Sequence, residues 1–319
     1  AASDVYKRQY VKSLEQRTMA EVITKVLYPA DDHVEGKLLR LKQQYFFISA
    51  TAQDIVRKHI RTWGDIRSFS KHHIIQINDT HPTMIIPELN PDHADIIKAQ
   101  RERLGTKRGF ISVKSNCSLQ SYVPALFPLS EFGVKDVLVC TYQAISGAGK
   151  TFETWPEMID NVIPYIGGEE EKSEREPLKI WGKIEGGEIV PAKNPNFTAQ
   201  CLRVPVSDGH MAAVFVRFEN KPTKEQILKI WKDFKGYPQQ VGLPSAPKQF
   251  LNYFEEDNMP QTRLNRELEG GMAISVGRLR EDTQYDYKFV CLSHNTLRGA
   301  AGGAVLMAEL LCEKGYMDR

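Results

Sequence analysis

The chain has 319 residues, of which 26% are charged, and its formal net charge is +2. This length suggests two domains or one large domain, with ample capacity for a buried core. Basic and acidic residues are interspersed, and no apolar run approaches the roughly 20 residues that span a bilayer, so the sequence predicts no nucleic-acid partner and no membrane partner.

The first quarter of the chain is predicted to be mainly helical. Residues 1–9 have no initiator Met and no clear periodicity, so we interpret them as a non-native leader. From Tyr10 to about Pro87 apolar residues recur at helical spacing, and those around Tyr45 share one face. Ile74–Ile77 is predicted to be a short buried strand.

Strands and helices alternate in the rest of the chain. Asn90 and Pro91 are typical of the cap and the first position of a helix. Thr223 and Gln226 fit a capping box, and Ser207–Gly209 favours a turn that pairs its two flanking strands. Strands are predicted at Phe110–Val113, Val134–Ile145, Phe197–Val206, Met211–Phe218, Gly271–Leu279 and Tyr285–Leu292, and helices at Asn90–Leu104, Glu169–Trp181, Thr223–Phe234 and Thr296–Glu313.

Cys117 is the first candidate for a reactive side chain. The predicted strand breaks at Ser115 and Asn116, just before this cysteine, and helical character follows it. Unpaired N–H groups at a helix N-terminus favour a thiolate, so we expect Cys117 to be acidic and nucleophilic. An isolated cysteine, without such motifs around it, is more often a small buried core residue.

Two later motifs, Gln143–Gly149 and Arg203–His210, offer the groups that a thiolate catalyst needs. With a pKa near neutrality, the imidazole of His210 can exchange protons with a thiol and with a substrate oxygen. A lone histidine after a turn is otherwise a surface hydrogen-bonding group.

Metal binding is not predicted. The five cysteines are scattered and form no C-x-x-C pair, which argues against a disulfide framework and a structural zinc site. His72 and His73 are adjacent, so their side chains face different directions and make a poor metal pair. The cysteine usage fits a reducing compartment, and we expect a cytoplasmic location.

Four separated motifs then suggest a family: Lys114–Ser118 (KSNCS), Tyr142–Gly149 (YQAISGAG), Arg203–His210 (RVPVSDGH) and His294–Gly303 (HNTLRGAAGG). From about residue 86 to residue 318 the chain resembles aspartate-semialdehyde dehydrogenase of the archaeal and fungal type. The resemblance implies an α/β fold, with a mixed-sheet catalytic domain of the aspartate-semialdehyde/glyceraldehyde-3-phosphate dehydrogenase type and an incomplete Rossmann-like domain.

The same resemblance implies the activity. It is an NADP-dependent, phosphorylating aldehyde dehydrogenase that interconverts aspartate semialdehyde and aspartyl phosphate through a cysteine thioacyl intermediate, in the biosynthesis of lysine, methionine and threonine. The family also implies a homodimer or homotetramer. The resemblance thus implies aspartate semialdehyde and phosphate as the small-molecule partners and NADP as the cofactor.

The family's catalytic and substrate-binding roles carry over to matching positions. Cys117 resembles the nucleophile and His210 the general acid/base. Arg203 resembles the clamp on the substrate carboxylate, Gln143 the amide that orients the acyl group, and Asn116 a phosphate contact. For Arg203 a surface ion pair is the alternative.

Five further positions match contacts of the family. Glu169 would bind the substrate ammonium and Lys172 the phosphate, although an acidic-basic helix start is commonly a solvated face. Ser146, Gly147 and Asn295 match positions that line the nicotinamide end of the cofactor, where glycine allows a close approach to the backbone. A simple turn is the alternative reading of Gly147.

Residues from about 10 to 88 instead resemble glycogen phosphorylase, through Leu27–Pro29 (LYP), Glu35–Lys37 (EGK), Leu39–Gln43 (LRLKQ) and Gln76–Pro82 (QINDTHP). We therefore interpret the chain as a fusion whose first part is a mainly helical foreign segment. The predicted division is a leader at 1–9, a phosphorylase-like fragment at 10–86, a remnant of the dinucleotide-binding domain at 87–116, a catalytic and dimerisation domain at 117–293, and a C-terminal helix at 294–319 that packs on the dinucleotide-binding domain.

Two alternatives to an active dehydrogenase stay open. No G-x-x-G-x-x-G or G-x-G-x-x-G pattern precedes Cys117, so no glycine-rich turn is evident there for a pyrophosphate. The chain could then be a catalytically inactive chimeric polypeptide that lacks the dinucleotide-binding domain. The other alternative is a sugar-binding phosphorylase fragment.

Overall fold

The computed structural model describes residues 45–47, 83–105 and 107–317. The predicted leader, most of the predicted N-terminal helices and the strand at Ile74–Ile77 lie outside these residues. Tyr45–Phe47 forms strand β1, so the helix predicted around Tyr45 is wrong at this point.

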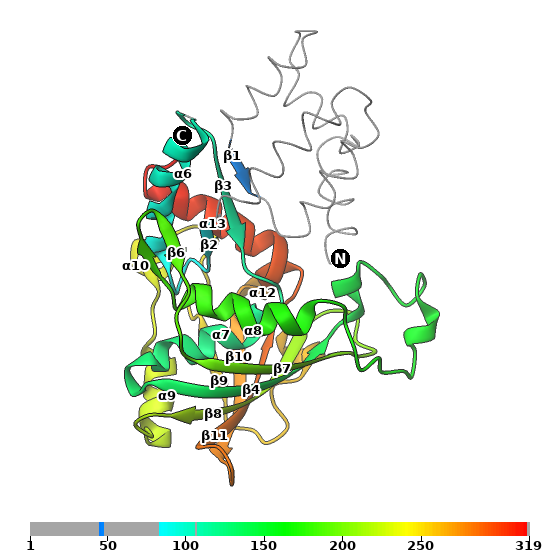
Figure 1. The fold of residues 1–319 in the computed structure, drawn as a ribbon. Helices are drawn as coiled ribbons and strands as arrows, with labels where there is room; N and C mark the ends of the chain where they lie inside the picture. The colour runs from blue at the N-terminus through cyan, green and yellow to red at the C-terminus, as the bar shows by residue number, and fades with distance from the viewer. Residues whose placement is uncertain (1–44, 48–82, 106, 318–319) are drawn as a thin grey trace.

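A mixed six-stranded sheet forms the larger part of the fold (Figure 1). β4 pairs in parallel with β7 and antiparallel with β8, and β9 pairs in parallel with β10. The pairs β8–β11 and β10–β11 are antiparallel. In spatial order the strands are β7 (Asn196–Arg203), β4 (Val134–Gln143), β8 (His210–Phe218), β11 (Tyr287–Ser293), β10 (Ile274–Glu281) and β9 (Leu251–Phe254).

The predicted hairpin between β7 and β8 is wrong. Both strands form where they were predicted, but β4 lies between them and pairs with each. Local turn chemistry at Ser207–Gly209 could not reveal this, because β4, which comes much earlier in the chain, lies between the two strands that the turn joins. The inserted strand has alternating buried and half-buried residues, which suits a sheet with one covered face.

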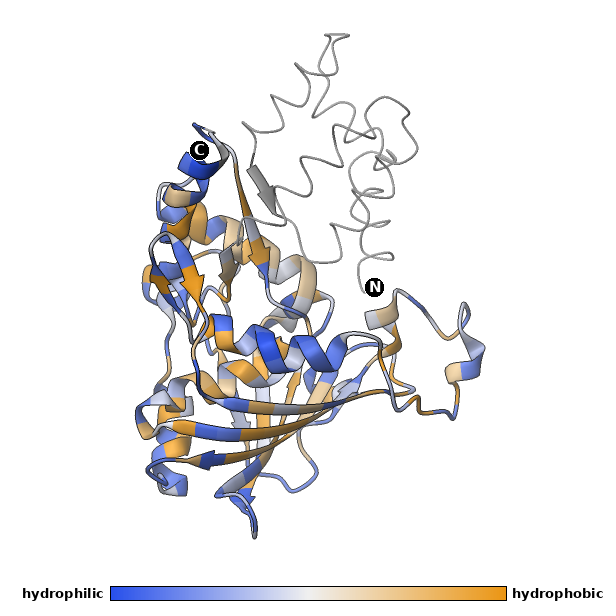
Figure 2. Ribbon diagram, in the orientation of Figure 1, coloured by the Kyte–Doolittle hydropathy of each residue, from blue (hydrophilic) through white to orange (hydrophobic). Residues whose placement is uncertain are grey.

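Three helices cover one face of this sheet: α7 (Leu119–Leu126), α8 (Glu169–Ile180) and α9 (Lys224–Asp233). Figure 2 shows α8 as largely hydrophilic on its visible side, while its buried residues Ser173, Pro177 and Ile180 face inward. Trp231 of α9 is fully buried and donates to the Ala125 carbonyl oxygen at 2.7 Å. The core therefore lies between the sheet and these helices.

Two predicted helix starts have different outcomes. The capping box at the start of α9 is confirmed, since Thr223 accepts from the Gln226 N–H and the Gln226 side chain accepts from the Thr223 N–H. Asn90 does not cap a helix, because its side chain instead accepts from the Ile86 N–H and donates to the Met84 carbonyl. The predicted helix begins as the 3-10 helix η1 (Pro91–Asp95) and continues as α6 (Ile96–Leu104).

A second, parallel sheet has the order β1-β3-β2, with β3 at Phe110–Lys114 and β2 at Thr83–Ile85. Helix α13 (Gly302–Glu313) packs against it, and its residues Leu306, Met307, Leu310 and Leu311 are buried in a core that also contains Ile85 and Phe110. A π-helix, η5 (Leu297–Ala301), precedes α13 and joins it to the end of β11. Cys117 thus follows the C-terminal end of β3 in the parallel sheet, and η5, from near the C-terminus of the chain, packs close to it.

The remaining elements connect these layers. The segment between β4 and α8 projects from the body, and Ile159, Val162 and Tyr165 are exposed there (Figure 1). No helix among the described residues is long and apolar enough to cross a membrane. The connecting elements are η2 (Phe127–Phe132), η3 (Ile145–Ala148), η4 (Pro156–Met158), β5 (Lys183–Glu185), β6 (Glu188–Val190), α10 (Tyr237–Val241), α11 (Thr262–Asn265) and α12 (Leu268–Gly271).

A fully buried ion pair joins the two sheets. The Arg298 guanidinium on η5 donates to the two carboxylate oxygens of Glu88 at 2.6 and 2.5 Å. It also donates to Gln120 of α7 at 3.1 Å and lies 4.8 Å from the ring centre of Phe250. Residues from four separate parts of the chain therefore meet at one charged side chain.

Arg298→Met is expected to lower the free energy of unfolding by about 3–5 kcal/mol, because it leaves the Glu88 carboxylate buried and uncompensated. Urea unfolding measures this loss. The matched control is Lys314→Met, whose partner Asp92 is 88% exposed and whose loss should cause a much smaller change. The double variant Glu88→Gln/Arg298→Met should recover part of the loss. An Arg298→Met cost no larger than that of the control would contradict this role.

Candidate active site

The candidate residues gather at one edge of the large sheet because of its strand register. Gln143 at the end of β4 pairs with Arg203 at the end of β7. His210 at the start of β8 pairs with Ser293 at the end of β11, and the HNTLRG motif follows. Motifs far apart in the sequence therefore end at the same edge.

The nucleophile turn is residues 115–118, which join β3 to α7. The Asn116 side-chain oxygen accepts from the Ser118 N–H at 2.8 Å and from the Ser118 hydroxyl at 2.9 Å, which fixes the turn at the start of the helix. Cys117 is partly exposed and precedes α7 by two residues. A Cβ added at Gly299 would lie 2.8 Å from the Cys117 Cβ, so glycine is required where η5 packs on the nucleophile turn.

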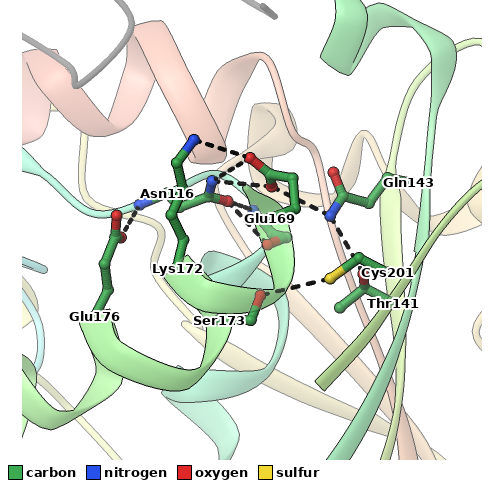
Figure 3. A network of polar contacts seen from close by, with 9 residues as sticks. Asn116, Thr141, Gln143, Glu169, Lys172, Ser173, Glu176 and Cys201 are labelled. Carbon is green, nitrogen blue, oxygen red and sulfur yellow. Dashed lines mark hydrogen bonds and ion pairs between the residues drawn. The ribbon is translucent and has the colours of Figure 1, made fainter. Parts of the chain in front are cut away.

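Four predicted site residues form one polar network (Figure 3). The Asn116 amide donates to both Glu169 carboxylate oxygens at 3.0 Å. Lys172 forms an ion pair with Glu169 at 3.1 Å, and the Gln143 amide donates to Glu169 at 3.3 Å. Glu169 is therefore the centre of this network, on the first turn of α8.

A second group is organised by the backbone of Ala144. Its N–H donates to His210 Nδ1 at 3.1 Å, and its carbonyl oxygen accepts from Arg203 Nη1 at 2.7 Å. A Cβ added at Gly147 would lie 2.6 Å from Arg203 Nη1 and 2.9 Å from His210 Cε1. The glycine at position 147 is thus explained by the side chains packed on it.

Asn295 fixes the turn that carries His210. Its side-chain oxygen accepts from the Gly209 N–H at 2.8 Å, and its amide donates to the Ser146 hydroxyl at 2.9 Å. Asn295 is fully buried. Ser146, Gly147 and Asn295 therefore lie together beside His210, as a separate group from the Glu169 network.

Arg203 connects the two groups electrostatically. It lies close enough to both Cys117 and His210 to change the pKa of each. It is buried, and no carboxylate in the described part of the chain forms an ion pair with it. No hydrogen bond between Cys117 and His210 is present among these residues, and Arg203 is a charged neighbour that acts on both.

The pKa of Cys117 is shifted in the opposite direction to the one predicted from the sequence. Although the residue is partly exposed, desolvation of its thiol by the surrounding atoms raises the pKa of Cys117, and the Glu169 carboxylate adds to this rise, while Lys114 and Arg203 oppose it. α7 begins only at Leu119, two residues after Cys117, and is short. The thiolate predicted from the helix end is therefore disfavoured in the free protein.

The near-neutral pKa predicted for His210 is also wrong. Burial places the pKa of the ring well below its usual value, and the Arg203 charge lowers it further. Because Nδ1 accepts from Ala144, the neutral ring carries its proton on Nε2. Nε2 is buried and has no hydrogen-bond partner, so it is a donor available to a ligand.

Sequence reasoning missed several residues that build the site. The Asn116 N–H donates to the Glu176 carboxylate at 2.7 Å, and the Lys114 ammonium donates to the Gly299 carbonyl. Glu176 lies seven residues after Glu169, on the same face of α8, and this spacing was a usable signal. No signal in the sequence could reveal the role of the Ala144 backbone, because almost any residue type supplies the same N–H and carbonyl groups. No set of three metal-ligating side chains occurs among the described residues.

With this geometry in place, comparison with known proteins identifies the class. A family model described as "Semialdehyde dehydrogenase, dimerisation domain" matches residues 126–298, which is more than half of the chain. The chain therefore belongs to the semialdehyde dehydrogenase family.

Within that family the chain is similar to aspartate-semialdehyde dehydrogenases. It is 37% identical to the enzyme of Aspergillus fumigatus over 83% of this chain and 73% of that protein. It is 42% identical to the Methanothermobacter thermautotrophicus enzyme over 72% of this chain and 67% of that protein. The structure of the Candida albicans enzyme with NADP covers 76% of this chain and 69% of that chain, at 38% identity and a TM-score of 0.66.

A second family model, "Carbohydrate phosphorylase", matches residues 2–96. The two matches together agree with the fusion inferred from the sequence. The phosphorylase match runs past Thr83 and therefore includes β2 and η1, which pack within the dehydrogenase-like fold.

The buried His210 predicts a pH dependence of stability. As the pH falls below about 6.5, the unfolded chain binds a proton at His210 that the folded protein does not, so stability decreases. His210→Gln should reduce the slope of the unfolding free energy against pH by up to about 1.4 kcal/mol per unit. Urea unfolding between about pH 7 and about pH 5 measures both slopes. His93 and His294, whose pKa values are also lowered, contribute to the slope that remains in the variant. Identical slopes in the two proteins would contradict a neutral, buried His210.

Proposed function

We propose that this protein is a phosphorylating aspartate-semialdehyde dehydrogenase that uses NADP. The observation that carries the proposal is the single cluster in which Cys117, the Glu169 network and the buried Arg203 are mutually close. A thiol, a cation for a carboxylate and an anion for an ammonium are the groups that a short amino-acid aldehyde requires.

We assign the substrate contacts from the charged side chains of the site and the partners that they have. Arg203 is a buried guanidinium without a carboxylate partner among the described residues, which suits the α-carboxylate of aspartate semialdehyde. Glu169 would pair with the substrate ammonium. Lys172, which is 43% exposed at its side chain, would contact phosphate together with Asn116.

In the proposed reaction Cys117 loses its proton to solvent, its sulfur attacks the aldehyde carbon, and the carbonyl oxygen takes up a proton, which gives a thiohemiacetal. His210 Nε2–H donates a hydrogen bond to the substrate oxygen, and the Gln143 amide orients the same group. When bound, NADP would supply the hydride acceptor for oxidation of the adduct to a thioacyl group. Phosphate then attacks the thioacyl carbon, and the Cys117 sulfur leaves as aspartyl phosphate forms.

The tautomer of His210 limits its part in this reaction. For Nε2 to accept the thiol proton, Nδ1 must carry the ring proton and lose its bond from the Ala144 N–H. The described arrangement therefore suits His210 as a donor to the substrate oxygen more directly than as a base for Cys117.

The described residues fit the nicotinamide end of NADP. The Asn295 amide holds the Ser146 hydroxyl at 2.9 Å, and Gly147 beside them leaves free the space that a Cβ would fill against Arg203 and His210. Ser146, Gly147 and Asn295 would hold this end of the cofactor. No glycine-rich phosphate turn precedes Cys117 in the sequence, and this favours the second candidate, a chain that keeps the catalytic fold but does not bind the dinucleotide.

We also propose a homodimer in a cytoplasmic setting. The sheet face opposite the helices has half-buried apolar residues, including Leu138, Tyr142, Met211 and Phe215, which a second copy would cover. The matched family model is a dimerisation domain, which supports this arrangement. The five free cysteines fit a reducing compartment.

Cys117→Ser is expected to lower phosphate-dependent reduction of NADP by aspartate semialdehyde by about 10³-fold or more, because the nucleophile is lost. Absorbance of the reduced nicotinamide follows the reaction. The matched control is Cys312→Ser on α13, which should keep wild-type activity. Should the unmodified chain show neither turnover nor a thermal shift with NADPH at millimolar concentration, the inactive chimera would replace this proposal. Binding of maltooligosaccharides would instead support the sugar-binding alternative.

Arg203→Lys is expected to lower kcat/KM for aspartate semialdehyde by about tenfold to a hundredfold, because an ammonium cannot reproduce the planar fork of a guanidinium. Steady-state kinetics with an aldehyde that lacks the α-carboxylate provide the comparison. For that substrate the two proteins should differ much less. An equal loss for both substrates would show that Arg203 acts on Cys117 or His210 and does not bind the carboxylate.

A further inference from the structure

Lys114 is a buried cation with an unusual set of partners. It ends β3 and is only 6% exposed. Its ammonium donates to the carbonyl oxygens of Ser115, at 2.7 Å, and Gly299. No carboxylate in the described part of the chain forms an ion pair with it. A buried charge that has only neutral acceptors needs an anionic group nearby to be stable.

Two groups near the Lys114 ammonium can carry a negative charge, the Cys117 sulfur and the Glu176 carboxylate. The contacts of the ammonium bring it to the Cys117 side, because Ser115 belongs to the nucleophile turn and Gly299 packs on it. Gly299 packs so closely on Cys117 that an added Cβ would lie 2.8 Å from the Cys117 Cβ and 3.2 Å from its Cα. A Cβ added at Gly303 would lie 3.1 Å from the Lys114 Cδ, so the lysine stem is also enclosed by α13.

The other charged groups around the nucleophile turn come from three elements. α8 supplies Glu169, Lys172 and Glu176, β7 supplies Arg203, and η5 supplies Arg298. Burial lowers the pKa of Lys114 to about 8, while Cys117 and Glu176 oppose this change. Glu169 disfavours a negative sulfur, whereas Lys114 and Arg203 favour it.

We propose that Lys114 is a positioning residue whose positive charge, held by the Gly299 and Ser115 carbonyls, stabilises the thiolate of Cys117. The proposal rests on Cys117 being the nucleophile of the proposed function. It gives Lys114 a role separate from substrate binding, since its ammonium is directed to the backbone on both sides of the turn. Arg203, the other favourable charge, remains assigned to the substrate carboxylate.

The test is the pH dependence of Cys117 alkylation by iodoacetamide, in which the thiolate sulfur displaces iodide. Mass spectrometry of the Cys117 peptide follows this one residue, because Cys140 and Cys312 are also partly exposed. Three variants separate charge from hydrogen bonding. Lys114→Met removes both, Lys114→Gln keeps a donor for the carbonyls, and Lys114→Arg keeps the charge. The matched control is Lys229→Met, at an exposed lysine of α9.

Lys114→Met and Lys114→Gln should each slow alkylation of Cys117 about tenfold near neutral pH, where the Lys114 ammonium, with its pKa of about 8, is still charged in the wild type. Lys114→Arg should stay nearer to the wild type, and Lys229→Met should match it. A wild-type profile for Lys114→Gln would overturn the proposal, since hydrogen bonding alone would then suffice. If Lys114→Met does not fold, Lys114→Gln decides the question alone.

Alkylation needs neither NADP nor turnover. A chain that is inactive as a dehydrogenase but shows the expected shifts would therefore refute the proposed function and leave the role of Lys114 intact. Unshifted profiles in a chain that is active as a dehydrogenase would refute the role of Lys114 and leave the proposed function intact.

Discussion

The buried Arg298 guanidinium is the constraint on which the arrangement of the site depends. It holds Glu88, Gln120 and Phe250 around one charge, and these belong to the β2–η1 connection, to α7 and to the approach to β9. Such a pair contributes little net stability compared with apolar packing, but removing either partner is costly. Its geometric effect is larger. The next residue, Gly299, touches Cys117 and accepts a hydrogen bond from Lys114, so fixing Arg298 also fixes the nucleophile turn.

The site is built with its two reactive groups uncharged. Burial raises the pKa of Cys117 and lowers that of His210, so the pair is a thiol and a neutral imidazole near pH 7. The charges that act on the sulfur have opposite effects: Glu169 disfavours the thiolate, and Lys114 and Arg203 favour it. A ligand that neutralises Glu169 would therefore favour the thiolate, whereas one that neutralises Arg203 would disfavour it. The acidity of Cys117 is a property of the whole cluster and not of the helix end.

Local rules predicted the elements well and their arrangement poorly. The capping box at Thr223 and the helix from Glu169 followed from side chains a few residues apart. The false hairpin between β7 and β8 arose because the place of β4 depends on distant pairing. The site residues could be found because their motifs are specific, and sheet register then brought Gln143 and Arg203 together. The pKa directions could not be found, because burial of Cys117 and His210 is set by tertiary packing.

The segment around Glu88 shows why the boundary between the two resemblances is not a structural boundary. The carbohydrate phosphorylase match extends to residue 96, yet Thr83–Ile85 forms an edge of the parallel sheet and Glu88 is the partner of Arg298. A carboxylate at position 88 is therefore required by the dehydrogenase-like fold whatever its ancestry. The segment around Glu88 is compatible with the sequence patterns of both families. A junction between the two sequences is tolerated best at such a segment, because the buried partner of Arg298 is kept.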